Sequence, residues 1–113
     1  MLTYEKIVVQ LLAEFPQLHF DGGDVDLPHV IFENSFVPFV KDSLNGENSD
    51  LERIFAFMEK MATSQDKKVE NLLLVSVLEA LADDSSNRAA AKKCMLEKTF
   101  SLYQELSVYM KNI

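Results

Sequence analysis

Cysteine, glycine and proline are scarce in this sequence. The single cysteine, Cys94, has no partner for a disulfide within the chain, which excludes the class of small secreted proteins held together by disulfides. Three glycines and three prolines are too few for a flexible linker or a low-complexity tract. A chain of 113 residues has the ordinary length of one domain, so we expect a single all-helical domain over residues 1–113.

Long hydrophobic runs are also missing. The densest apolar stretch, residues 69–82, is interrupted by Glu70, Asn71 and Glu79, whereas a membrane-spanning helix needs about 20 apolar residues. The first residues carry neither the basic segment nor the apolar core of a signal peptide. We therefore expect a cytoplasmic protein that does not bind membranes.

Catalytic motifs are absent too: the sequence has no Gly-rich phosphate loop, Cys-x-x-Cys pair, His-Glu-x-x-His or nucleophile elbow. Its two histidines, His19 and His29, flank a stretch that contains Asp21, Asp24 and Asp26. These five side chains would suit a metal ion, but the aspartates lack the spacing and the closing glutamate of a calcium-binding loop. We predict no enzyme, no cofactor and no metal site, and rank a metal-dependent site at the histidines last among the alternatives.

Positive charge is in deficit, with 18 acids against 11 bases and a net charge of −7. The deficit is concentrated in residues 21–50, where seven acids face Lys41 alone, whereas residues 85–113 carry five bases against two acids. Nucleic-acid binding requires a basic face that neutralises phosphates, so we expect no nucleic-acid partner. A basic protein partner is compatible with this charge distribution, because the acidic half would steer its approach.

Apolar residues recur at helical spacing near the start of the chain. In residues 4–15 they lie three or four positions apart, which predicts an amphipathic helix that Pro16 ends. Pro28 suits the first position of a further helical stretch, where its missing N–H is not needed. A polar pair at 34–35 predicts the N-cap of the next helix, which the Asn-Gly pair at 45–46 would close.

Three further helices complete the predicted fold. Ser49-x-x-Glu52 is a capping box that begins a helix over residues 51–62. Residues 69–82 are apolar on nearly every side of a helical wheel, which indicates a buried helix. A last helix is predicted over residues 88–111, with a packing stripe along 95–113. The predicted fold is an all-α, single-domain bundle of about five helices around the buried central helix.

Two of these stretches resemble a known kind of protein. The run Leu51-Glu-Arg-Ile-Phe-Ala-Phe-Met-Glu-Lys-Met-Ala62, the polar turn after it and the run Val69-x-Asn-Leu-Leu-x-Val-Ser-Val-Leu-Glu-x-Leu81 are similar to a family of small, uncharacterised all-helical bacterial proteins. Members of that family are similar to immunity proteins, which neutralise toxins used between competing bacteria. The resemblance covers residues 27–110 and implies mainly the fold, since its motifs are core positions.

These observations favour a non-enzymatic protein-binding module, of the immunity type, that masks a basic toxin or another basic partner. Asp83 and Asp84 contribute to this view, although their position between two helices also suits a cap for the following helix. The predicted partner-binding residues are acidic: Asp21, Asp24, Asp26, Glu33, Asp83 and Asp84. The alternative is a structural helical module that forms a homodimer through the stripe at 95–113.

Overall fold

Helices account for most of the part of the chain that the computed structural model describes, which is residues 2–18, 27–46 and 50–110. This part contains no strand. Where adjoining segments join without a break, it forms six helices, at residues 4–14, 28–44, 51–62, 67–83, 88–94 and 97–110. The predicted all-α fold is therefore confirmed, with one helix more than the five expected.

The first two helices each combine segments of different pitch. η1 (Tyr4–Lys6) is a 3-10 turn that leads into α1 (Ile7–Glu14). α2 (Pro28–Ile31), the π-helical η3 (Phe32–Phe36) and α3 (Val37–Leu44) join into one helix, which we name the α2–α3 helix. As predicted, Pro28 stands in its first turn and the Asn-Gly pair follows its end.

The N-cap predicted at Asn34 or Ser35 is wrong, because the α2–α3 helix runs through both residues. Pro38 lies inside this helix without ending it. In a regular α-helix its ring would clash with the Asn34 carbonyl four residues earlier. Just before the proline, the Val37 N–H donates instead to the Phe32 carbonyl, five residues back. The wider π turn is thus the local adjustment that accompanies Pro38.

The central helix consists of α5 (Lys67–Leu72), the π-helical η4 (Leu73–Leu78) and α6 (Glu79–Asp83). It packs against α4 (Leu51–Ala62) and against η3. Its apolar side chains with no exposed surface are Val69, Leu72, Leu73, Val77, Leu78, Leu81 and Ala82. Val75 is 42% exposed and marks the open side of the helix. The predicted buried central helix is confirmed around most of its circumference.

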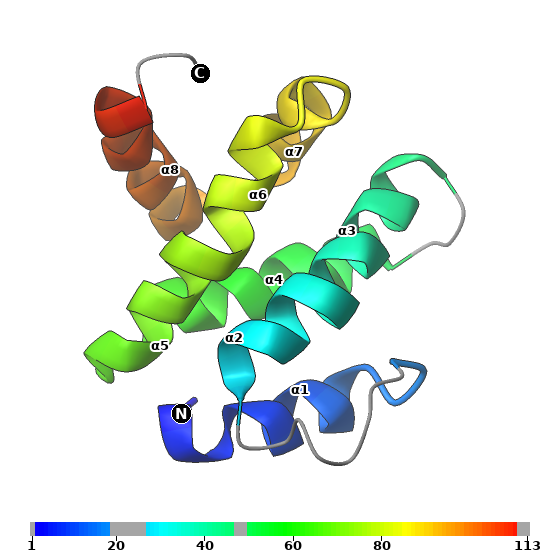
Figure 1. The fold of residues 1–113 in the computed structure, drawn as a ribbon, viewed down its shortest axis with the longest axis vertical. Helices are drawn as coiled ribbons and strands as arrows, with labels where there is room; N and C mark the ends of the chain where they lie inside the picture. Colours follow the sequence, from blue (N-terminus) through cyan, green and yellow to red (C-terminus); the bar gives the residue numbers. More distant parts are fainter. Residues whose placement is uncertain (1, 19–26, 47–49, 111–113) are drawn as a thin grey trace.

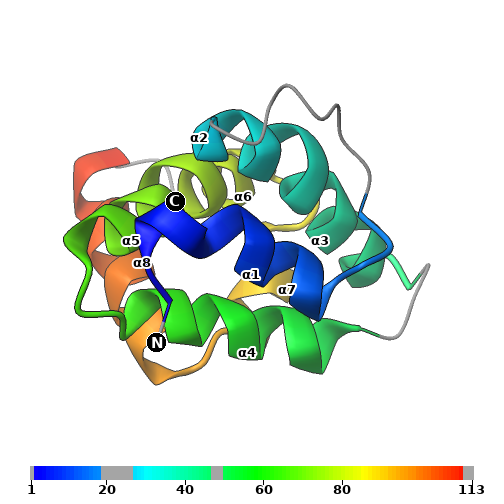
Figure 2. The same cartoon turned by 90° about the horizontal axis from the view of Figure 1, so that it is seen from below.

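The helices are arranged in layers around one core. Figure 1 shows the α2–α3 helix and the central helix on the near face of the molecule, diverging from one another, with α4 behind them. In Figure 2, α4 lies on the opposite side from α2, α3 and α6, and α1 passes between the two sides. The ring of Phe15 fills the space between them, with centroids 6.0, 5.5 and 5.8 Å from those of Phe36, Phe39 and Phe57.

The last predicted helix is divided in two, which corrects the expectation of one helix over residues 88–111. α7 (Arg88–Cys94) ends at Met95, whose backbone is extended at φ −67° and ψ 134°, and α8 (Glu97–Met110) begins after it. α8 packs against α4 and η4. Within the predicted stripe Thr99 and Leu106 are buried and Leu102 and Met110 pack partly buried against the core, whereas Tyr109 is 85% exposed, so the described part of the stripe packs inside the molecule apart from Tyr109.

Candidate functional site

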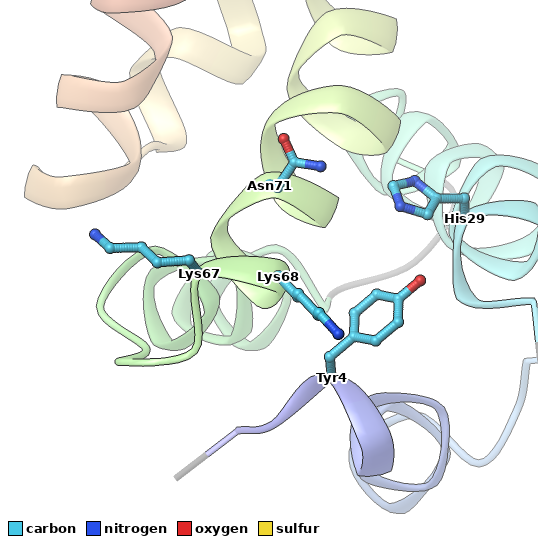
Figure 3. A pocket seen from close by; sticks show the side chains of 5 residues that line it. All are labelled: Tyr4, His29, Lys67, Lys68 and Asn71. Atoms are coloured by element: carbon cyan, nitrogen blue, oxygen red, sulfur yellow. The ribbon is translucent and has the colours of Figure 1, made fainter.

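An open pocket of about 510 Å³ lies where η1, α2 and α5 meet. Its lining residues are Tyr4, His29, Lys67, Lys68 and Asn71, shown in Figure 3. They come from three segments that are far apart in the sequence, so only the folded chain brings them together. A volume of this size lies within the range of about 300–1,000 Å³ that is typical of small-molecule sites.

Tyr4 is held at the pocket by the turn between α4 and α5. Its backbone N–H donates to Asp66 Oδ2 at 2.9 Å, and Asp66 Oδ1 accepts the Lys68 N–H at 3.0 Å. Ser64 Oγ donates to the Leu2 carbonyl at 2.8 Å, which fastens the same segment a second time. The hydrogen bond from Tyr4, followed by that from Lys68, lowers the pKa of Asp66 below its usual value of 3.8. Asp66 is therefore both the N-cap of α5 and the anchor of η1.

His29 is oriented by a short polar chain. Its Nδ1 lies 2.6 Å from the hydroxyl oxygen of Ser76, which is 1% exposed. The Ser76 hydroxyl in turn directs its proton to Glu33 Oε1, at 3.5 Å. A serine hydroxyl has one proton, so when that proton is directed to Glu33, Ser76 accepts the Nδ1–H of His29 and the lone pair of Nε2 is left for the pocket. The order differs from a catalytic triad, since the serine stands in the middle and is buried.

The hydrogen bond from Ser76 to Glu33 joins two π-helical segments that pack against one another. Glu33 belongs to η3 and Ser76 to η4. Short π segments within α-helices occur frequently at functional sites, because they re-aim a side chain by adding a residue to one turn. The polar chain that orients His29 thus passes through the contact between the two π segments.

Lys68 is the cation nearest the centre of the pocket. Its Nζ lies 6.0 Å from the centroid of the Tyr4 ring. Figure 3 shows its ammonium end beside that ring, the Tyr4 hydroxyl turned toward His29, and Lys67 extending away. Lys67 Nζ pairs with Glu70 at 3.6 Å and its side chain is 85% exposed.

Acidic side chains lie on the side of the central helix that carries Ser76 and on the η3 segment that packs against η4. Ser76, Glu79 and Asp83 are spaced by three and four residues, so they share one side of the central helix. Ser76 contacts His29 and Glu33, which shows that this side faces the α2–α3 helix. We name Glu33, Glu79 and Asp83 the acidic seam.

The structure places the predicted partner-binding residues in different settings. Asp21, Asp24 and Asp26 lie outside the described residues, as does His19. Glu33 and Asp83 are exposed and belong to the acidic seam. The sequence reasoning had not singled out Glu79 for partner binding, since its helical relation to Ser76 acquires meaning only once Ser76 is known to face Glu33.

Asp84 is engaged within the molecule. Its Oδ2 accepts the Asn87 side-chain amide at 2.8 Å and pairs with Lys41 Nζ at 3.2 Å. Its Oδ1 accepts the backbone N–H of Ser86 at 3.0 Å. The Asn87 side chain is the largest cause of the lowered pKa of Asp84, and Lys41 and Ser86 add to it. Asp84 thus fixes the turn that precedes α7, whereas the N-cap position of α7 is taken by Asn87, so Asp84 is not the helix cap that the sequence suggested.

Two negative findings apply to the described ranges, 2–18, 27–46 and 50–110. No group of three or more His, Cys, Asp or Glu side chains there is placed to hold a metal ion. Nor does any helix in these ranges combine the length and the apolar character needed to cross a membrane.

Comparison with known families gives one match. The family described as "Domain of unknown function (DUF7674)" matches residues 8–110. The chain belongs to the DUF7674 family. The matched range of DUF7674 includes the whole acidic seam and four of the five pocket residues, whereas Tyr4 precedes it. No curated protein and no solved structure shows a significant match to the chain.

Proposed function

We propose that this DUF7674 protein is a non-enzymatic, cytoplasmic binding module whose acidic seam binds a basic partner protein. The observation that supports the proposal is that the three carboxylates of the seam have no ion-pair partner within the described residues. Glu79 and Asp83 share the side of the central helix that carries Ser76, and Glu33 lies on the facing η3 segment. Lys41 of α3 is already paired with Asp84.

The seam also offers an apolar contact. Val75 lies four residues before Glu79, so the two side chains are neighbours on the surface of the central helix. Val75 is 42% exposed. An apolar centre beside charged residues is the usual composition of a protein interface, in which buried apolar area supplies affinity and the charges supply orientation.

The strength of exposed ion pairs determines whether the seam contributes mainly to the affinity or to the association rate of a partner. An exposed ion pair contributes about 0–1 kcal/mol, so three carboxylates do not by themselves give tight binding. Their combined field, together with a net charge of −7, raises the rate at which a basic partner associates. The proposed role of the seam is therefore recognition and steering.

The resemblance to immunity proteins supports a specific form of this proposal, in which the partner is a basic bacterial toxin. A compact acidic module that covers a basic surface would neutralise such a toxin without any chemistry of its own. The DUF7674 description names no activity, so this form of the proposal depends on the seam and on the resemblance.

The experiment begins with a pull-down from the source cell, with the product of the neighbouring gene co-expressed. We expect one basic protein in stoichiometric amount, released by salt, since at about 1 M ionic strength charges act over roughly 3 Å. Binding kinetics are then compared between wild type and the triple variant Glu33→Lys, Glu79→Lys, Asp83→Lys. The matched control carries Glu5→Lys, Glu97→Lys and Glu105→Lys, which change the net charge equally.

We expect the association rate of the seam variant to fall by at least about tenfold, because steering contributes 10–10³ in rate. The control should lose much less. Equal losses in both variants would mean that only the total charge matters, and an unchanged rate in both would disprove the proposal. Far-ultraviolet circular dichroism of each variant verifies that it is folded.

Self-association is the second candidate, favoured by the end of α8. Val108 is 74% exposed and Tyr109 is 85% exposed, and the two are neighbours in the sequence. Light scattering over a range of protein concentrations measures the mass directly. A dimer that Tyr109→Ser returns to a single chain supports this candidate, whereas a mass of one chain at millimolar concentration eliminates it.

A further inference from the structure

We propose that the pocket between η1, α2 and α5 binds a small phosphorylated ligand that carries a hydroxyl group near its phosphate, as sugar phosphates and nucleotides do. The described residues that line the pocket include two lysines and no carboxylate, and Glu33 of the acidic seam reaches it only through Ser76 and His29. Its hydrogen-bonding groups come from Tyr4, His29, Lys68 and Asn71.

The first step concerns the groups that supply donors. The Tyr4 hydroxyl, the Lys68 ammonium and the Asn71 side-chain amide form no hydrogen bond or ion pair with other described residues, although all three line the pocket. Each of them can donate to an oxygen of a bound ligand. Figure 3 shows the three side chains around the same opening.

The second step concerns charge, because the protein as a whole is acidic. The carboxylates around the pocket already have partners: Asp66 accepts the N–H groups of Tyr4 and Lys68, Glu70 pairs with Lys67, and Glu33 accepts the Ser76 hydroxyl. The Lys68 ammonium acts on Asp66 through space without forming an ion pair with it, and it lies beside the Tyr4 ring, where it can also contact a ligand. A lysine ammonium at the wall of an open pocket favours an anion, and phosphate oxygens accept several donors at once.

The third step concerns His29, which adds specificity. The chain from Glu33 through Ser76 fixes its Nδ1–H inward, so Nε2 presents a lone pair to the pocket. An imidazole in this tautomer accepts a hydrogen bond through Nε2 and therefore suits a ligand hydroxyl, whereas a phosphate oxygen without a proton cannot donate to it. The rings of His29 and Tyr4, with centroids 6.3 Å apart, form the wall between the hydroxyl side and the phosphate side.

The size of the pocket agrees with this ligand. About 510 Å³ is several times the volume of a phosphate group, so room remains for a sugar-sized body. Lys67, which extends away from the opening, is not required for the ligand.

The test measures binding of three probes at pH 8 by nuclear magnetic resonance titration: ribose 5-phosphate, inorganic phosphate and ribose. We expect ribose 5-phosphate to bind most tightly, phosphate more weakly, and ribose without measurable effect. Lys68→Met should weaken ribose 5-phosphate by about tenfold or more, because a charged hydrogen bond is worth about 1.5–3 kcal/mol. Lys93→Met on α7 is the matched control and should leave binding unchanged.

Ser76→Ala tests the role of His29 separately. Ser76 is a positioning residue, so its loss frees the imidazole without removing any group that touches the ligand. The preference for ribose 5-phosphate over phosphate should fall toward one, while the affinity for phosphate is retained. Retention of the preference would overturn the role of the Glu33–Ser76–His29 chain.

The proposal is overturned as a whole by either of two results. The first is that phosphate and sulfate bind equally and weakly, with chemical-shift changes spread over all surface lysines, which would indicate an adventitious ion only. The second is that Lys68→Met and Lys93→Met bind ribose 5-phosphate as wild type does. Thermal unfolding of each variant verifies that a lost signal is not lost structure.

Discussion

Glu59 of α4 caps α8 at Thr99, 40 residues further along the chain. Glu59 Oε1 accepts the Thr99 N–H and the Thr99 hydroxyl, each at 2.9 Å, and Oε2 accepts the Lys98 N–H at 2.9 Å. Thr99 is fully buried. The residues that precede α8, Met95 and Leu96, have no oxygen in their side chains with which to cap it. One carboxylate from another helix therefore provides what the local sequence lacks.

Replacing Glu59 by Ala should lower the free energy of unfolding by about 1–2 kcal/mol, the usual loss for an N-cap. The buried Thr99 hydroxyl would lose its acceptor at the same time. Urea unfolding at pH 7 measures the effect, with Glu105→Ala as the matched control on the exposed side of α8. Equal midpoints for the two variants would contradict the capping role of Glu59.

Asp66 should make stability depend on pH in the acid range. Its pKa is lowered in the folded protein from its usual value of 3.8, first by the hydrogen bond from the Tyr4 N–H and then by that from the Lys68 N–H. The contribution is therefore fully present above pH 4 to 5 and is lost as pH falls from 3.8 through the lower folded pKa.

Urea midpoints of wild type and Asp66→Asn at pH 7 and at pH 3 test this dependence. The two proteins should differ most at pH 7 and approach one another at pH 3, because protonation removes the same charge that the substitution removes. A difference that widens toward pH 3 would have the wrong sign. Asp42→Asn, an exposed residue of α3, is the control.

Tyr103 should be replaceable by Phe with a gain in stability. Its side chain is 2% exposed, and its hydroxyl has no hydrogen-bond partner among the described residues. Burial raises its pKa, which Arg88 partly offsets. An unsatisfied buried polar group costs about 1–3 kcal/mol, so Tyr103→Phe should raise the unfolding free energy by about 1 kcal/mol. Tyr109→Phe at the exposed end of α8 should change nothing, and a loss at Tyr103 would reveal a partner for its hydroxyl.

Gly46 should resist replacement for a backbone reason alone. Its φ is 84°, in the left-handed region, and nothing lies within 4 Å of the position that a Cβ would occupy. Gly46→Ala should therefore cost about 1–2 kcal/mol of strain without any clash. Gly46→Asn should cost less, since asparagine tolerates this conformation. Equal losses for Ala and Asn would point to a steric cause.

The sequence predicted those parts of the fold that local chemistry determines. Pro28 begins a helix because its ring suits the first turn, and Gly46 follows one because it tolerates a positive φ. Most apolar residues of 69–82 are buried because apolar side chains surround the helix on nearly every side. Each of these inferences needed only neighbouring residues.

The sequence-based predictions were wrong where contacts between residues distant in the sequence determine the structure. A helix was predicted to begin at the polar pair 34–35, but the chain is already helical before this pair and continues past Pro38 through a π turn. Met95 was expected inside a helix, but α8 starts afresh where Glu59 caps it. The pocket could not be predicted for the same reason. Tyr4 belongs to the apolar pattern of residues 4–15, and nothing in the sequence indicates that Tyr4 and Lys68 lie close to His29.

The hydrogen bond from Tyr4 to Asp66 joins residues 62 positions apart, so it cannot form during synthesis until Asp66 has been made. Proteins are synthesised at about 5–20 residues per second, so roughly 3–12 s separate the making of these two residues. During that interval residues 4–14 cannot form the hydrogen bond to Asp66, and their apolar side chains lack the partners that come later in the chain. The earliest helix of this chain is thus fastened only after its middle has been made.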